Sequence, residues 1–148
     1  MEGGILQGSA VDIFLRMFAV AKPSKIAVDV EVLHWSYEYC LAQTQENSAL
    51  FVATHTLARE QLFKWVGPLL PTKISVIDKK SKNLHPKTLK ELNNFRIAAI
   101  REDIGKLLLK TKSIDLNNIF SMRSSENAAK NLAYGRVDLG AYKENVAM

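Results

Sequence analysis

The sequence predicts an α/β protein with two lobes, each built around a small sheet. Segments with the alternating or continuous apolar pattern of strands are repeatedly followed by segments with helical spacing, which is typical of largely parallel sheets covered by helices. Gly67, Pro68 and Pro71 interrupt this alternation near the middle of the chain, where we expect the boundary between the lobes. The expected lobes are residues 1–70 and 71–148.

The first half is expected to contain two helices, two strands and a short capped helix. These elements are a helix over 10–22, a strand over 28–35, a helix over 36–45, a buried strand over 48–53, and a turn with a short helix over 54–63. Val11, Phe14 and Phe18 give the first helix its apolar spacing, and Thr54 or Thr56 is the expected cap of the last.

The second half repeats this order. The expected elements are a strand over 72–78, a short helix over 85–95, a strand over 96–100, a helix over 103–110, a strand near 118–121, a helix over 124–135, and a strand over 136–142. Ser124 or Ser125 is the expected cap of the last helix, and Gly135 its end.

Composition and charge argue against a nucleic-acid partner. The 148 residues are 47% hydrophobic and 24% charged, and 20 basic against 15 acidic residues leave a net charge of +5. Acidic residues lie between and around the lysine clusters, which is the pattern of a solvated surface rather than of a basic binding stripe.

Cysteine and histidine usage supports neither a disulfide nor a metal site. Cys40 is the single cysteine, and we expect it to be a small buried residue of a helix. The three histidines are far apart in the sequence and show no ligand spacing. We therefore expect no cofactor.

No recognised catalytic motif is present: the chain lacks a GxSxG elbow, a P-loop and a GxGxxG turn. No apolar run reaches membrane-spanning length, and the N-terminus lacks the basic start and apolar core of a signal peptide. These features leave two alternatives open, a cytoplasmic protein or one whose leader has been removed.

The stretch ATHTLAREQLFKWVGP, residues 53–68, has two interpretations. Thr54, Thr56 and Arg59 follow an expected strand, and ligands of open α/β sheets bind beyond the carboxyl ends of strands. Hydroxyl groups and a guanidinium suit a carboxylate, which arginine can bind through two hydrogen bonds. The alternative is a helix cap followed by a surface arginine.

Five segments, taken in order, resemble the solute-binding proteins of amino-acid-type ABC transporters, which have the type II periplasmic binding fold. The segments are GILQGSAVDIFLRMFA, DVEVLHWSYEYCLAQTQENSALFVA, ATHTLAREQLFKWVGPL, TLKELNNFRIAAIREDIGKLLL and SSENAAKNLAYGRVDLGAYKENVA. The third is similar to the family's "T.T.eR" signature. The resemblance covers nearly the whole chain, and it implies a binding protein rather than an enzyme.

The resemblance implies roles for single residues. Arg59, supported by Thr54, would bind the ligand carboxylate, and Trp35 would stack on the ligand, although it would serve equally well as a core aromatic. Arg101 and Asp103 belong to the segment that corresponds to the second-lobe loop, where helix amides face the carboxylate.

Two departures from the family pattern affect the expected ligand. Glu102 and Asp103 stand where the family has Gly-Thr or Gly-Ser, and Lys143 aligns with the aspartate that holds the α-amino group. A related organic acid or a modified amine therefore fits as well as a standard α-amino acid.

The resemblance also implies partners and a location. We expect a small carboxylate-bearing ligand, an ABC transporter permease, a periplasmic location, and closure about a hinge at 67–72 with a second crossing at 141–145. The family's first strand and C-terminal return have no counterpart here, so exposed sheet edges favour a homodimer. The alternatives are a cleft enzyme, such as a dehydratase of a cyclic acid, and a sensory or non-functional ligand-binding domain.

Overall fold

The computed structural model describes residues 8–21 and 29–144. The helices are α1 (Ser9–Ala21), α2 (Trp35–Thr44), α3 (Ile104–Thr111) and α4 (Ser125–Ala133), with 3-10 helices η1 (Leu57–Leu62), η2 (Lys90–Asn94) and η3 (Leu116–Asn118). The strands are β1 (Ile74–Asp78), β2 (Ile97–Ile100), β3 (Ile119–Met122) and β4 (Leu139–Lys143). Residues 22 and 28, at the ends of two expected elements, lie outside the described residues.

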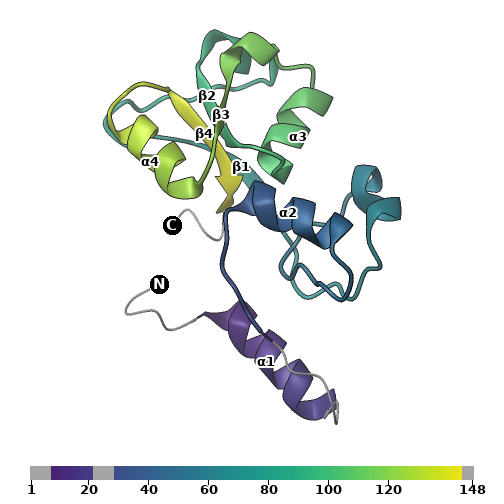
Figure 1. The fold of residues 1–148 in the computed structure, drawn as a ribbon. Coiled ribbons are helices and arrows are strands. Elements are labelled where there is room, and N and C mark those ends of the chain that lie inside the picture. Colours follow the sequence, from purple (N-terminus) through teal and green to yellow (C-terminus); the bar gives the residue numbers. More distant parts are fainter. Residues whose placement is uncertain (1–7, 22–28, 145–148) are drawn as a thin grey trace.

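The four strands form one mixed sheet in the order β1-β4-β2-β3 (Figure 1). β2 is parallel to both β3 and β4, and Ile97 is in register with Ile119 on one side and with Leu139 on the other. β1 runs antiparallel to β4, with Ile74 opposite Lys143. The α/β class expected from the sequence is therefore confirmed.

Helices α3 and α4 cover opposite faces of this sheet. Gly105 of α3 lies against Ala141 of β4, whereas Leu132 of α4 lies beside Gly140, the preceding residue of that strand. Consecutive residues of a strand face opposite sides of the sheet, so the two helices lie on different sides, as Figure 1 shows. Every residue of β2 is buried, as expected for a strand covered on both faces.

The core lies within the second half of the chain. It is formed by residues of β2, β3, β4, α3 and the adjoining loops, namely Leu92, Ile97, Ala99, Leu109, Ile114, Ile119, Leu139 and Ala141. Parallel strands leave their carboxyl ends at one edge of the sheet, so the loop after β2 and the end of β4 lie at the same edge.

The first half contains no sheet among the described residues, which corrects the expectation of two sheets. Residues 29–34 and 48–56 belong to no strand, although 28–35 and 48–53 were the expected strands. A strand requires a partner for its backbone groups, and the described chain offers these two segments no ladder. Neither segment contains a buried residue, and Val52 has a positive φ of 65°, so the apolar pattern by itself led to neither a buried nor a paired strand.

Helix α1 packs on this first half through aromatic side chains. Phe14 stacks on Phe51 with ring centroids 4.7 Å apart, and Phe18 follows Phe14 along the helix at 4.8 Å. Figure 1 shows α1 apart from the sheet. No helix within the described residues is long and apolar enough to cross a membrane.

Two further expectations need correction. The helix expected over 85–95 is confined to the 3-10 turn η2, because Pro86 and the polar residues after it leave only Leu92 buried. Cys40 is exposed rather than buried, since α2 presents no residue to a closed core.

Candidate functional site

Arg59 is a buried cation on the 3-10 helix η1. The Thr-x-Thr segment enters this helix in an extended conformation, and Thr56 occupies the capping position without a side-chain hydrogen bond to the helix. Arg59 is only 4% exposed. Its Nη1 donates to the carbonyl of Thr54 at 3.2 Å, and its Nη2 donates to the carbonyl of Glu102 at 2.6 Å.

Two aromatic rings from α2 lie against this guanidinium. Trp35 and Tyr39 are four residues apart and therefore share one face of the helix. The Arg59 Cζ lies 5.6 Å from the Trp35 ring centroid and 5.1 Å from that of Tyr39. Such contacts stabilise a cation by about 0.5–2 kcal/mol.

Two buried polar atoms beside Arg59 have no hydrogen-bond partner among the described residues. They are the Nε1 of Trp35 and the Oγ1 of Thr56. An unsatisfied buried donor costs about 1–3 kcal/mol, and native proteins rarely leave one without an accepting group or a water. Both atoms can donate, although neither Trp35 nor Thr56 is among the residues that line the cavity described below.

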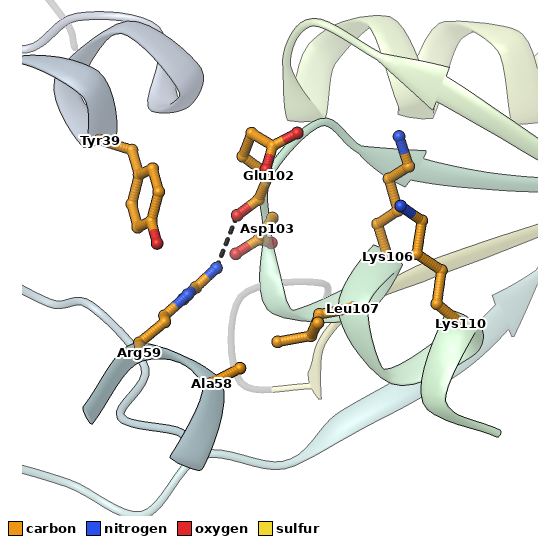
Figure 2. A pocket seen from close by; sticks show the side chains of 8 residues that line it. All are labelled: Tyr39, Ala58, Arg59, Glu102, Asp103, Lys106, Leu107 and Lys110. Carbon is orange, nitrogen blue, oxygen red and sulfur yellow. Dashed lines mark hydrogen bonds between the residues drawn. The ribbon is translucent and has the colours of Figure 1, made fainter. Parts of the chain in front are cut away.

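The opposite wall is the loop after β2 and the first turns of α3. Glu102 has a positive φ of 58°, a conformation that turns its carbonyl toward Arg59 (Figure 2). Asp103 precedes α3 and is 6% exposed, and its carboxylate caps no helix amide. Figure 2 shows Lys106 and Lys110 following one another along α3.

These two walls border a half-open cavity of about 200 Å³. Its lining residues are Tyr39, Ala58, Arg59, Glu102, Asp103, Lys106, Leu107 and Lys110. The first three come from the first half of the chain and the other five from the second half. A small molecule placed there would contact both parts of the protein.

The charge of Arg59 has no ion-pair partner among the described residues. Backbone carbonyls and aromatic rings surround it instead. A buried charge without a counter-ion is costly, which makes this guanidinium a suitable binding site for an anion. The described residues contain no group of His, Cys, Asp and Glu side chains that could hold a metal ion.

Lys143, at the carboxyl end of β4, also lies beside Trp35. Its Nζ is 5.8 Å from the centroid of the indole ring. The parallel pairing of β4 with β2 explains this position, since it places the end of β4 at the same edge as the 101–103 loop.

The structure brings together four of the five residues selected from the sequence. Arg59, Asp103, the Thr54 carbonyl and the Trp35 ring lie at or beside the cavity, whereas Arg101 is exposed and does not line it. Sequence reasoning missed Tyr39, Lys106 and Lys110. Their four-residue spacing, from Trp35 to Tyr39 and from Lys106 to Lys110, was the available signal.

Solved structures match the chain closely in backbone and weakly in sequence. An arginine-bound mutant of ArgBP from T. maritima matches at a TM-score of 0.84 and 14% identity, covering 99% of this chain and 67% of that protein. The arginine-, lysine-, histidine-binding protein ArtJ from Geobacillus stearothermophilus matches at 0.87 and 18%, covering 99% and 62%. AncCDT-1, an ancestral amino acid-binding protein and a precursor of cyclohexadienyl dehydratase, matches at 0.78 and 19%, covering 99% and 65%.

These comparisons define the fold as part of the type II periplasmic binding fold found in amino-acid-binding proteins. The chain spans 62–67% of the length of these three proteins. No protein-family model matches the chain, and no curated protein matches its sequence. The structural neighbours compared here are amino-acid-binding proteins, one of them a dehydratase precursor.

Proposed function

We propose that the protein binds a small carboxylate-bearing ligand, an amino acid or a related acid, in the cavity between the two halves of the chain. The observation that carries this proposal is the buried Arg59 guanidinium, which faces the cavity and has no ion-pair partner among the described residues. Thr54 holds the guanidinium through its carbonyl, and the Trp35 and Tyr39 rings lie against it.

The fold supports a role for this binding in ABC-type uptake. In such a system residues 1–70 and 71–148 form the two lobes, the ligand bridges them, and closure about the 67–72 connection presents the complex to a permease. The protein would then act in the periplasm. A carboxylate at Arg59 would also lie close to the start of α3, where helix amides favour a negative charge.

Titration calorimetry with a panel of amino acids and small carboxylates tests the proposal. The Arg59→Ala variant should lose about 2–4 kcal/mol of binding free energy for any panel member that binds the wild type. Arg136 offers a matched control, because it is exposed and contacts only the ring of its neighbour Tyr134 among the aromatics. The Arg136→Ala variant should bind normally. An unchanged affinity in Arg59→Ala, with the fold retained by circular dichroism, would place the carboxylate elsewhere.

A cleft enzyme, such as a dehydratase of a cyclic acid, is the second candidate. It is favoured by the buried carboxyl group of Asp103 at the cavity wall and by the likeness to AncCDT-1. Asp103 would act as the general acid or base. Turnover of a cyclic hydroxy acid by the wild type, lost in Asp103→Asn while binding persists, would favour the enzyme. Binding without turnover would favour the solute-binding role.

We further propose a homodimer that forms through the edges of the sheet. Each outer strand pairs on only one side among the described strands, and Val76 of β1 and Phe120 of β3 are both exposed. Unpaired strand edges readily pair with another chain. Light scattering across a concentration series should show a dimer, and a monomer at the highest concentration would contradict it.

A further inference from the structure

Two cations from distant parts of the chain lie against one ring. The Nζ of Lys143 is 5.8 Å from the centroid of Trp35, and the Cζ of Arg59 is 5.6 Å from the same centroid. Arg59 arrives from η1, whereas Lys143 arrives from the end of β4. Both positive charges therefore lie against one indole ring, beside the cavity that Arg59 lines.

Neither cation is neutralised by the described residues. The ion pairs of the described chain involve other groups, and neither Arg59 nor Lys143 takes part in one. Like charges disfavour one another when they are close, and an anion placed between two cations is attracted by both. The buried Nε1 of Trp35 adds a third group that can only donate.

The opposite wall carries charged groups of both signs, the acidic Glu102 and Asp103 together with Lys106 and Lys110. Glu102 turns its carbonyl toward Arg59 and is exposed, so its carboxylate is in contact with solvent. Asp103 is buried at the cavity wall. The site thus offers Arg59 and Lys143 beside Trp35, and on the opposite wall one buried carboxyl group with the two lysines Lys106 and Lys110. This pattern complements a molecule with two acidic groups, and with an amine where one is present.

We propose that Lys143 is a specificity-determining residue: it binds the second acidic group of a small dicarboxylic ligand and repels ligands with cationic side chains. The proposal rests on the proposed function, because Arg59 must hold the first carboxylate. It sets this chain apart from ArgBP and ArtJ, whose described ligands include arginine. A lysine beside the ring would oppose the guanidinium of such a ligand.

The test is calorimetry with L-glutamate, glutarate, L-glutamine and L-arginine on the full chain. The wild type should bind the two diacids more tightly than L-glutamine and should reject L-arginine. Lys143→Met keeps the aliphatic stem and removes the charge, so it should weaken both diacids by about tenfold and change L-glutamine by less than about twofold. Lys143→Arg keeps the charge and should retain diacid binding.

A control separates this effect from a change in net charge. Lys80 lies in the turn after β1 and is exposed, so Lys80→Met should leave every affinity unchanged. Equal losses for the diacids and L-glutamine in Lys143→Met, or wild-type binding of L-arginine as tight as that of glutarate, would overturn the proposal while leaving the proposed function intact. Absence of binding by all four compounds would overturn the proposal on Lys143, whereas the wider panel of amino acids and small carboxylates decides the proposed function. Melting curves of each variant verify that the comparison is made on folded protein.

Discussion

The guanidinium of Arg59 donates a hydrogen bond to the backbone carbonyl of Glu102, with Nη2 and the oxygen 2.6 Å apart. The two residues are 43 positions apart, and their bond joins η1 to the loop that follows β2. Glu102 makes this contact from the left-handed region of backbone space, at a φ of 58°. The contact thus combines a buried charge with an unfavourable backbone conformation.

Glycine at position 102 should stabilise the protein. A non-glycine residue in the left-handed region is disfavoured by about 1 kcal/mol, and glycine removes this penalty without removing the carbonyl that Arg59 uses. We expect Glu102→Gly to raise the free energy of unfolding by up to about 1 kcal/mol in urea titrations. Glu102→Gln keeps the conformation and removes only an exposed charge, so it should change little. A glycine variant less stable than the glutamine variant would show that the conformation carries no penalty.

Replacing Trp35 with phenylalanine tests the role of the indole Nε1 as a hydrogen-bond donor while an aromatic ring is kept at this position. The buried Nε1 has no partner among the described residues, so its removal should cost the ligand-free protein no hydrogen bond, only the packing of the ring atoms that phenylalanine lacks. Ligand affinity should fall by about tenfold if the atom donates to the ligand. Trp65→Phe is the matched control, because its Nε1 donates to the carbonyl of Glu60 at 3.3 Å. That variant should lose about 1 kcal/mol of stability and keep its affinity. Calorimetry and urea unfolding measure both quantities, and a loss of stability in Trp35→Phe as large as in the control would contradict the assignment.

Alanine at position 105 should destabilise the packing of α3 on the sheet. A Cβ added to Gly105 would lie 2.8 Å from the carbonyl oxygen of Ala141, which is backbone and cannot rotate away. We expect a loss of about 1–3 kcal/mol in the free energy of unfolding. At Gly140 the nearest atom to an added Cβ is the Cγ1 of Ile77 at 3.6 Å, an ordinary contact, so Gly140→Ala should be tolerated. Similar melting temperatures for the two variants would contradict the close approach of α3.

The sequence predicted the second half of the fold better than the first, because the expected strands of the second half find partner strands in the sheet. Residues 96–100 and 136–142 were expected strands, and β2 and β4 form there because each finds a partner in register. Residues 48–53 have the same apolar character but no partner in the described chain, so no strand forms. The local pattern shows which segments are apolar, whereas a strand forms only where a second strand lies alongside and pairs with it.

The candidate site was predictable in part. Thr54 and Arg59 could be selected because hydroxyls and a guanidinium follow an apolar run, and the structure places Arg59 in the wall of the cavity rather than on the surface. The position of Lys143 beside Trp35 could not be read from the sequence. It depends on the parallel register of β4 with β2, and on the approach of α2 to the end of the sheet.

Asp138 should make the free energy of unfolding depend on pH in the acidic range. Its carboxylate accepts hydrogen bonds from Arg96 at 2.9 Å and from Lys82 at 2.8 Å, and these contacts hold the chain at the starts of β2 and β4. The hydrogen bond from Arg96, and then that from Lys82, hold the pKa of Asp138 well below its ordinary value despite partial burial, which opposes the shift. A lowered folded-state pKa means that the stabilisation is fully present above the ordinary value of about 3.9 and is lost as the pH falls below it.

Asparagine at position 138 should therefore lower the free energy of unfolding by about 1–3 kcal/mol near neutral pH, because it leaves Arg96 and Lys82 without their counter-ion. The difference from the wild type should shrink as the pH falls from about 4 toward 2, because the carboxyl group then takes up a proton in the unfolded state while the ion pairs keep it ionised in the folded state. Glu126→Gln is the matched control, since it breaks an exposed pair with Lys130 that lies within one turn of α4 and contributes little to stability. Urea unfolding from pH 2 to 7 measures these differences. The difference in the free energy of unfolding between Asp138→Asn and the wild type could instead stay constant down to pH 2. That result would show that the lost stability comes from packing rather than from the charge of Asp138.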